Sequence, residues 1–254
     1  MIYKVIVLEV RINRRNEVAR RNLQPYWLKR SLDVFNSFYV EHFCLPHFDS
    51  TGKGIRVMNP RYLEVSGPKI TLGNDVHIMA LRDKPVRLAV YEGLGEIKIG
   101  DYCLINPGVR MSSADSITIG DSCMFAMNAY LSDADWHDLQ HRIFAPGKHA
   151  GITLGNNVWI GDSALICKGV NIGENSIVGA WSVVTKDVPD NVVVAGNPAK
   201  VIRALDASDI TSREHLFNMN MPYEEFEDDW FHKLLKGNTF RTWFRSLLIP
   251  SRRD

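Results

Sequence analysis

The sequence lacks long apolar runs, cysteine motifs and an excess of charge of either sign. None of its apolar runs reaches the roughly 18 residues that a membrane-spanning helix needs. Its four cysteines show no CxxC or Cys–His spacing of the kind found in zinc sites, and Cys103 and Cys123 stand at small-residue positions where packing accounts for them. The 30 basic and 29 acidic side chains leave a net charge of +1, which gives no field strong enough to recruit nucleic acid.

Two further absences bear on where the protein works. The apolar stretch 1–10 carries Lys4 and Glu9 and lacks a small-residue cleavage site, so we do not expect a secretory signal there. No cysteine pattern indicates disulfides, which makes the reducing cytoplasm the expected compartment. The chain has 254 residues, 45% hydrophobic and 23% charged, which is typical of one soluble domain with appendages.

What the sequence does contain is a six-residue repeat between Ile152 and Arg203. Aliphatic residues recur in it without slippage at Leu154, Ile160, Ile166, Ile172, Val178 and Val184. This period matches neither the 3.6 residues of a helix nor the two of an ordinary strand. It indicates units of one short strand and one turn, which must stack because a lone unit cannot bury its aliphatic residue.

This stretch contains the residues VWIGD…GV.IGENS.VGA.SVVTKD.P…AGNPAKVIR. In these residues its sequence resembles the hexapeptide-repeat acyltransferases. Within them it is similar to the sugar O-acetyltransferase branch, which includes galactoside and maltose acetyltransferases and polysaccharide-modifying enzymes. The resemblance implies an all-β solenoid, a left-handed parallel β-helix with three hexapeptides per coil. The left hand comes from the resemblance alone, since crossover rules favour the opposite sense. The resemblance also implies acetyl-CoA as cosubstrate, no metal, and a homotrimer with sites between subunits, closed symmetry being the norm for oligomers.

Outside this stretch the repeat is less regular. It begins near Ile70, loses register through 82–95, and continues as Ile99, Ile105 and Met111 and then as Ile119, Phe125 and Leu131. The interval from Ile119 to Leu154 exceeds one coil by about seventeen residues, so an insertion at 132–151 should project from the binding face. We therefore expect an N-terminal arm and helical cap (1–69), a β-helix domain (70–203) and a C-terminal helical extension (204–254).

Helical periodicity appears on both sides of the repeat. Leu28, Leu32, Phe35 and Tyr39 predict an amphipathic helix within 24–43 that caps the solenoid end. Two more helices are predicted near 223–234 and 240–248, the second with apolar residues on one face and Arg241 and Arg245 on another. Its apolar face would pack on the solenoid or a neighbouring subunit, or contact the inner face of a membrane peripherally. The arginine-rich segment 1–22 is expected to be a solvated arm, with an anion-binding patch as the alternative.

Acyl transfer from a thioester needs a base for the attacking hydroxyl, donors for the oxyanion and a site that holds both substrates. His137, His141 and His149 lie in the insertion, and an imidazole can be neutral near pH 7. The resemblance implies His137 as general base, because relatives carry their catalytic histidine in an insertion shortly before IG..VWIG; His141 is the reserve. Asp135 or Asp138 could orient the ring, and the residues alone do not decide between them. No cysteine or serine adjoins a candidate base, so direct transfer is expected.

The resemblance also implies substrate-binding positions. Candidates for the acceptor are Asn106, Asp135, Trp136 and Arg142, although asparagine also suits the turn at 106. Candidates for coenzyme A are Trp159, Asp162, Ala180, Trp181, Thr185, Lys186, Lys200 and Arg203. The cations among them suit phosphate oxygens. Trp181 departs from the pattern, since relatives usually have glycine there.

The sequence is thus best interpreted as an O-acetyltransferase that moves acetyl from acetyl-CoA to a sugar hydroxyl, with a cell-surface polysaccharide or its precursor as acceptor. An N-acetyltransferase acting on an amino sugar is the first alternative. Less favoured alternatives are a non-catalytic β-helix scaffold and a metalloenzyme like the gamma-class carbonic anhydrases. Those enzymes use three histidines and an open zinc position, whereas His77 lies far from the histidines of the insertion.

Overall fold

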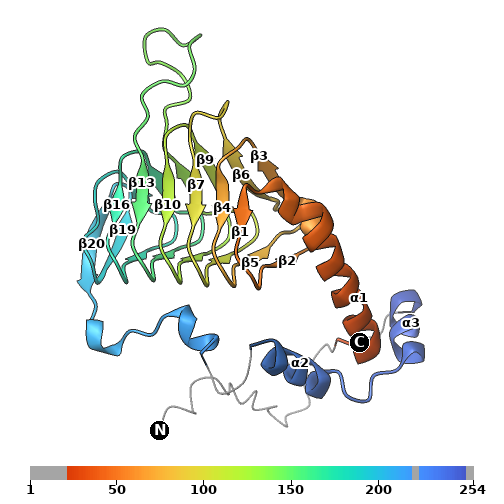
Figure 1. The fold of residues 1–254 in the computed structure, drawn as a ribbon. Helices are drawn as coiled ribbons and strands as arrows, with labels where there is room; N and C mark the ends of the chain where they lie inside the picture. Colours follow the sequence, from red (N-terminus) through yellow and green to blue (C-terminus); the bar gives the residue numbers. More distant parts are fainter. Residues whose placement is uncertain (1–21, 219–222, 250–254) are drawn as a thin grey trace. The chain divides into compact units, whose positions relative to one another are not determined.

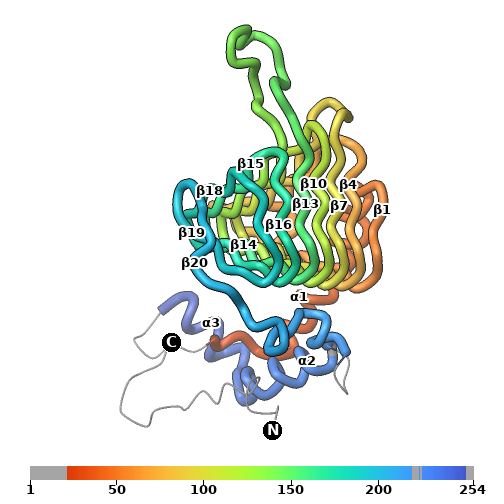
Figure 2. The backbone as a smooth tube through the Cα atoms, turned by 90° about the vertical axis from the view of Figure 1, so that its left-hand side faces the viewer, coloured from red at the N-terminus to blue at the C-terminus, as the bar shows by residue number. Residues whose placement is uncertain are grey.

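A computed structural model of the chain describes residues 22–218 and 223–249. Three β-sheets, here called A, B and C, form its central part (Figure 1). Neighbouring strands within the coils are parallel and lie three strands apart in sequence order. The chain therefore passes through all three sheets once per coil, which makes this part a parallel β-helix (Figure 2).

The strands are short, and among the described residues sheets A and C have six each and sheet B has eight. Sheet A contains β1 (Ser50–Thr51), β4 (Ile70–Leu72), β7 (Ile97–Ile99), β10 (Ile117–Ile119), β13 (Ile152–Leu154) and β16 (Asn171–Ile172). Sheet B contains β2 (Arg56–Met58), β5 (His77–Met79), β8 (Leu104–Ile105), β11 (Met124–Phe125), β14 (Trp159–Ile160), β17 (Ile177–Val178), β19 (Val192–Gly196) and β20 (Ala199–Ala204). Sheet C contains β3 (Leu63–Ser66), β6 (Val86–Val90), β9 (Arg110–Ser113), β12 (Tyr130–Ser132), β15 (Leu165–Cys167) and β18 (Val183–Val184).

The six-residue interpretation is confirmed by burial. All six aliphatic residues of the regular stretch point into the β-helix and are at most 2% exposed: Leu154, Ile160, Ile166, Ile172, Val178 and Val184. Strand pairing stacks each on its equivalent in the next coil, as Ile119 pairs with Leu154 and Phe125 with Ile160. This stacking forms one continuous core, because each coil covers the apolar residue of the last.

The coils begin earlier than the expected start at residue 70. Strands β1, β2 and β3 precede it and pair with β4, β5 and β6, with Val57 buried among the core residues. A 3-10 turn at Pro60–Tyr62 separates β2 from β3 and breaks the six-residue spacing there. A strand that the sequence did not predict, β6, lies within 82–95, where the six-residue register is lost. Its Leu88 is completely buried. Extra residues before β6 (80–85) and after it (91–96) account for the lost register.

The expected cap is present in a different form. Helix α1 (Tyr26–Tyr39) lies where the periodicity predicted a helix, but it has no buried residues, and Leu32 and Phe35 are largely exposed. The expectation that its apolar stripe covers the end of the solenoid is therefore wrong. The chain after α1 takes this role, because Val40, Cys44 and Phe48 join the core cluster.

The C-terminal helices lie where the sequence predicted them, as α2 (Tyr223–Leu234) and α3 (Phe240–Leu248). The chain divides into two compact units: Leu32–Tyr223, which holds the β-helix, and Met1–Ser31 with Glu224–Asp254. In the second unit the Tyr26 hydroxyl lies 2.7 Å from both carboxylate oxygens of Asp228, which also pairs with Arg30 at 2.8 Å. Across the described ranges, no helix has the combination of length and hydropathy needed to cross a bilayer. The N-terminal arm of the sequence prediction lies almost wholly outside the described residues.

Candidate active site

Three departures from the six-residue period lie at the corner where the chain passes from sheet C to sheet A. Residues 91–96, 114–116 and 133–151 connect β6 to β7, β9 to β10 and β12 to β13. The longest of these is the insertion expected from the sequence, and it projects well beyond the coils (Figures 1 and 2). Because the other corners are tight turns over most of the length, this one is where the fold has room for a site.

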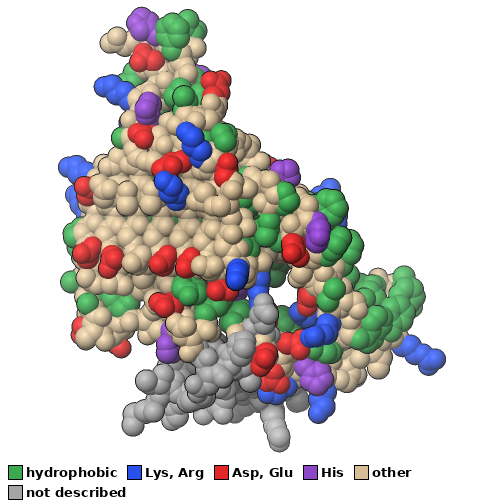
Figure 3. All heavy atoms as spheres, viewed as in Figure 1, with side chains coloured by type: hydrophobic (Ala, Val, Ile, Leu, Met, Phe, Trp, Pro, Cys, Tyr) green, Lys and Arg blue, Asp and Glu red, His purple; other side chains and the backbone are tan. Residues whose placement is uncertain are grey.

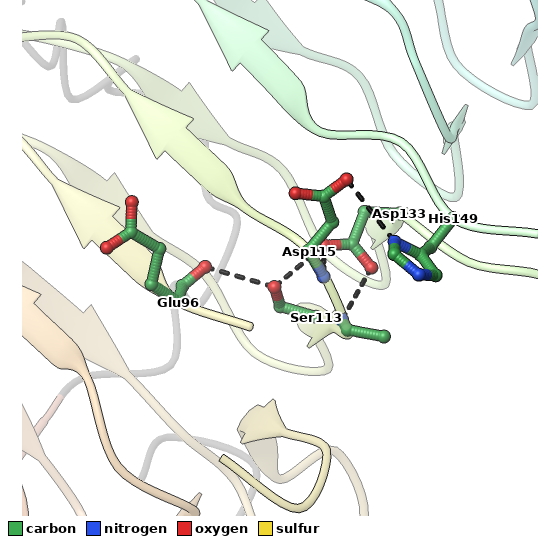
Figure 4. A network of polar contacts seen from close by, with 6 residues as sticks. Glu96, Ser113, Asp115, Asp133 and His149 are labelled. Atoms are coloured by element: carbon green, nitrogen blue, oxygen red, sulfur yellow. Dashed lines mark hydrogen bonds and ion pairs between the residues drawn. The ribbon is translucent and has the colours of Figure 1, made fainter. Parts of the chain in front are cut away.

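A buried carboxylate anchors the start of the insertion. Asp133 is 0% exposed, and its oxygens accept from the Ser113 hydroxyl (2.7 Å) and from the backbone N–H groups of Ala114 (2.7 Å) and Asp115 (3.0 Å). The Ser113 hydroxyl also lies 3.0 Å from the carbonyl oxygen of Glu96 (Figure 4). A buried charge is tolerated only when donors satisfy it, so these contacts tie the first residue of the insertion to two neighbouring connections.

The insertion has a hydrogen-bonded stalk. Its two arms run antiparallel through the bridge between Ala134 and His149, and the Asp135 N–H donates to the Lys148 carbonyl at 2.8 Å. The Gly147 N–H returns to the Asp135 carbonyl at 2.7 Å. A Cβ at Gly147 would lie 2.5 Å from the carbonyl oxygen of His137, so the arms approach so closely that only glycine fits.

Side chains also brace the stalk against the coils. Lys168 Nζ lies 2.6 Å from Asp135 Oδ1, and both side chains are about two-thirds buried. The Trp136 indole N–H donates to the Ser132 hydroxyl at 3.1 Å, and its ring lies 5.9 Å from that of Tyr91. Of the four acceptor-site candidates, Asp135 and Trp136 thus position the insertion in this chain.

His137 lies on the stalk with an exposed side chain. Neither expected partner orients its ring within this chain. Asp135 pairs with Lys168, whereas Asp138 accepts from the backbone N–H groups of His141 (2.7 Å) and Gln140 (2.9 Å). Those two hydrogen bonds, the one from His141 first, lower the pKa of Asp138. The general-base candidate is therefore accessible to a substrate from solvent, and neither Asp135 nor Asp138 orients its ring.

The structure does contain one histidine–carboxylate pair at this corner, which sequence reasoning missed. His149 Nδ1 lies 3.4 Å from Asp115 Oδ2, with both side chains about half exposed (Figure 4). The reserve candidate His141 sits further out, with its ring 6.3 Å from that of Phe144. Arg142 lies on the tip of the insertion among exposed apolar residues: Leu139, Ile143 and Phe144.

Asn106 lies at a different corner from His137. It directly follows β8, where the chain passes from sheet B to sheet C, and its side-chain amide donates to the Phe125 carbonyl at 2.7 Å. This hydrogen bond ties Asn106 to the next coil, and its role in the acceptor site stays a prediction. Within one chain, sheet C separates it from the corner that carries the insertion.

Most of the coenzyme A candidates gather around the last coils. Trp159 projects from sheet B and is 44% exposed, while Asp162, Ala180 and Trp181 form the next corner. Lys200 and Arg203 lie on β20, the antiparallel edge strand of sheet B, and both are exposed. Thr185 and Lys186 stand apart from these, at the far edge of sheet C after β18. Six of the eight candidates therefore lie on sheet B or at the corner that follows it.

Trp181 has an unusual backbone conformation. Its φ is +60°, in the left-handed region, and its side chain is 76% exposed. The equivalent corner positions in preceding coils are Gly108, Asn128 and Ser163, which are small residues with φ between 57° and 81°. The next residue, Ser182, accepts from the Gly196 N–H at 3.1 Å, which ties this corner to the β19–β20 turn. A large aromatic residue in this conformation is strained, and its side chain points out of the core, as the repeat register predicted.

Two other features bear on the alternatives. In the part of the chain that the structure describes, no three His, Cys, Asp or Glu side chains lie close enough to hold a metal ion. His77 lies on β5 of sheet B, with its ring near those of Phe217 and Tyr223. The described residues therefore provide no set of metal ligands for the metalloenzyme alternative.

The residues that build the base of the insertion were not identified from the sequence. Asp133 and Ser113 are twenty positions apart, and Lys168 follows Asp135 by thirty-three. The only available signal was an aspartate at the first position after a strand of the repeat. Recognising it required knowing that the extra residues at 114–116 lie on the same corner.

These features define a class of protein: a hexapeptide-type parallel β-helix with a histidine-bearing insertion at one corner. Two known repeat families match the coils on either side of the insertion. Bacterial transferase hexapeptide (six repeats) matches residues 151–186, and hexapeptide repeat of succinyl-transferase matches residues 96–133. The chain therefore contains hexapeptide repeats of the kind that these two families describe.

Individual proteins are similar to part of the chain. The chain is 42% identical over 123 residues to galactoside O-acetyltransferase of Escherichia coli, covering 47% of this chain and 60% of that protein. It is 31% identical over 121 residues to the putative lipopolysaccharide biosynthesis O-acetyl transferase WbbJ of E. coli, covering 44% and 62%. The matched part thus spans about three fifths of these relatives. AntD, an N-acyltransferase from Bacillus cereus solved with coenzyme A and an amino-sugar nucleotide, shares the fold with a TM-score of 0.50 and 19% identity over 78% of this chain and 96% of that one.

Proposed function

We propose that this protein is an acetyl-CoA-dependent O-acetyltransferase that acts on a sugar hydroxyl. The observation that carries the proposal is the exposed His137 on a braced insertion, in a chain whose coils match O-acetyltransferases of a galactoside and of lipopolysaccharide biosynthesis. The name of the second relative supports a cell-surface saccharide or its precursor as acceptor. The cytoplasm stays the proposed compartment on the sequence argument alone. The left-handed winding of the coils is inferred from the family.

The proposed reaction needs one base and no covalent intermediate. The His137 imidazole accepts the proton of the acceptor hydroxyl as the oxygen attacks the thioester carbonyl of acetyl-CoA. The tetrahedral intermediate collapses by breaking the carbon–sulfur bond, and the imidazolium returns the proton to the leaving thiolate. The products are an acetyl ester and coenzyme A. A positioned base of this kind contributes about 10²- to 10⁴-fold to the rate.

The placement of the candidates supports a site shared between copies of the chain. His137 and Asn106 lie at different corners of one β-helix, and most donor candidates accompany Asn106 rather than His137. A second copy whose donor corner faces the insertion would bring both halves together. We therefore propose a closed homotrimer with one site at each interface. Lys186, Lys200 and Arg203 are the cations proposed to contact the phosphates of acetyl-CoA.

A pair of matched variants tests the proposal. We expect His137→Ala to lower kcat by about 10²- to 10⁴-fold, whereas His141→Ala, a second exposed histidine of the insertion, retains most of the activity. Turnover is measured as thiol released from acetyl-CoA over a panel of galactosides, polysaccharide fragments and amino sugars, with calorimetry of acetyl-CoA binding to both variants. Thiol release at wild-type rates by His137→Ala would refute the assignment of the base. Turnover only with amino sugars would replace the hydroxyl acceptor with an amine.

A further inference from the structure

Helix α3 presents an apolar face that its own unit does not cover. Phe240, Trp243, Phe244, Leu247 and Leu248 recur at the spacing that aligns side chains on one side of a helix, and none of the residues of α3 is buried. The exposed fractions of Leu247, Leu248 and the following Ile249 are 60%, 65% and 72%. Figure 3 shows these apolar side chains gathered over α3. A contiguous patch of this kind on a soluble unit marks an interaction surface.

The patch continues onto the start of α1. The Trp27 ring lies 6.4 Å from that of Phe240, and Trp27 is 57% exposed. Phe240 in turn stacks on Phe244 with ring centroids 5.7 Å apart. Three aromatic rings therefore form an ordered, exposed row in the unit that holds α3.

The charge of this unit indicates what covers the patch. Within the described residues, 236–249 holds three cations, Lys236, Arg241 and Arg245, and no acidic residue. The other unit, Leu32–Tyr223, holds 16 basic and 21 acidic residues, a formal charge of −5. Cations without acidic residues near them in sequence therefore accompany the exposed apolar face of α3.

We propose that α3 docks on an anionic lipid surface, with its apolar face in the boundary between headgroups and acyl chains. An interfacial helix needs an apolar face with cations beside it, and Arg241 occupies such a flanking position next to Leu248. Each arginine near an anionic leaflet strengthens binding by about fivefold. The acidic unit is repelled by the same surface, which favours contact through α3.

A second copy of the chain fits this face less well. A helix of nine residues presents a face about 14 Å long and 10 Å wide. A stable protein interface buries about 800 Å² per partner, which is several times that area. Two copies meeting here would also bring the cations of two such segments, Lys236, Arg241 and Arg245 in each, together. A lipid surface has neither restriction. Resting on the proposed function, this docking would bring the enzyme to saccharides carried on membrane lipids.

The test uses the full chain and vesicles of phosphatidylcholine, with or without phosphatidylglycerol. We expect co-sedimentation with the anionic vesicles only, weakened by salt. Leu247→Ser with Leu248→Ser should lower the partition coefficient at least tenfold. Arg241→Gln should lower it about fivefold. The matched controls are Leu94→Ser, at an exposed leucine (57%) of the acidic unit, and Arg82→Gln, an exposed arginine of that unit, and both should bind as wild type.

Several outcomes would overturn the proposal. One is the absence of binding to anionic vesicles, and another is equal binding by wild type and the leucine variant. A fall in oligomer mass of the leucine variant in the absence of vesicles would show that a second copy covers the face. Because vesicle binding is measured without acetyl-CoA or acceptor, failure here is distinguishable from failure of the proposed activity. Circular dichroism should be unchanged in every variant, since the replaced side chains are exposed.

Discussion

Substitutions at Trp181 can distinguish the energetic cost of its backbone conformation from its contribution to acetyl-CoA binding. An L-residue in the left-handed region costs about 1–2 kcal/mol, and asparagine bears this cost better than other residues. The structure shows the same preference, since Asn128 occupies the equivalent corner position with φ +58°. Trp181→Asn should therefore relieve most of the strain at this corner.

The packing that the substitution removes is small. Trp181 is 76% exposed, so about a quarter of its side chain is covered. A quarter of ~250 Å², at ~25 cal/mol per Å², corresponds to about 1.5 kcal/mol as an upper limit. This loss and the relief of strain nearly cancel, so the free energy of unfolding should change by less than about 1 kcal/mol. Truncation of a buried tryptophan would instead cost about 3–5 kcal/mol.

Thermal unfolding and donor kinetics test the two parts of this reasoning. We expect the Tm of Trp181→Asn to stay within about 4 °C of wild type. The control Trp181→Ala loses the same contacts but keeps the strain, so it should be less stable than the asparagine variant by about 1 kcal/mol. If the indole forms a wall for the donor, KM for acetyl-CoA rises about fivefold in both variants, with a smaller change in kcat. Equal stability of the two variants would refute the claim that the backbone at Trp181 is strained. Tighter acetyl-CoA binding by the variants would show that the indole obstructs the donor.

Two further predictions concern buried polar groups. Asp133→Asn replaces a carboxylate that accepts from three donors, so it should lower the free energy of unfolding by about 2–3 kcal/mol and also lower kcat. The control Asp115→Asn, at a partly exposed carboxylate, should lower it by less than about 1 kcal/mol. Equal urea midpoints of the two variants would contradict the anchoring role of Asp133. Burial, with smaller contributions from Arg213 and Arg56, lowers the pKa of His77 from 6.5 to about 4. The unfolded chain therefore binds the additional proton between pH 6.5 and 4, and up to about 3 kcal/mol of stability is lost as the pH falls through that window. His77→Phe, which keeps a ring against Phe217 and Tyr223, should flatten the dependence of Tm on pH there, and an unchanged slope would show that other groups cause it.

The regular coils could be predicted because their spacing depends only on local contacts. Each aliphatic residue of the stretch from Leu154 to Val184 stacks on its equivalent one coil away, so burial imposes the same period on the sequence. The two C-terminal helices were predictable for a similar reason, since helical spacing is set by the backbone. In both cases the pattern reports geometry that repeats along the chain.

The irregular parts could not be read in this way. Strand β6 was missed because extra residues on either side of it shift the register, although Leu88 itself is as buried as any residue of the regular stretch. The stripe on α1 predicted a helix correctly but did not show which surface would cover it. The core instead recruits Val40 and Cys44 from the turn that follows. A periodic sequence identifies an element, whereas its neighbours depend on the chain's path.

The candidate site contains both residues that the sequence pattern predicted and residues that only the structure showed. His137 was predicted as the base because relatives carry their catalytic histidine shortly before a regular coil. The support of the insertion comes from Asp133 at its base and from residues at 113–115 and 168 on two other coils. Those contacts fix the stalk and leave the imidazole itself exposed. Both nearby carboxylates are engaged elsewhere, Asp135 by Lys168 and Asp138 by backbone N–H groups. A base with a rigid support and a free ring is suited to a site completed from outside the chain, by a second copy or by the substrates themselves. This is the arrangement expected if assembly, and not the single β-helix, produces the competent enzyme.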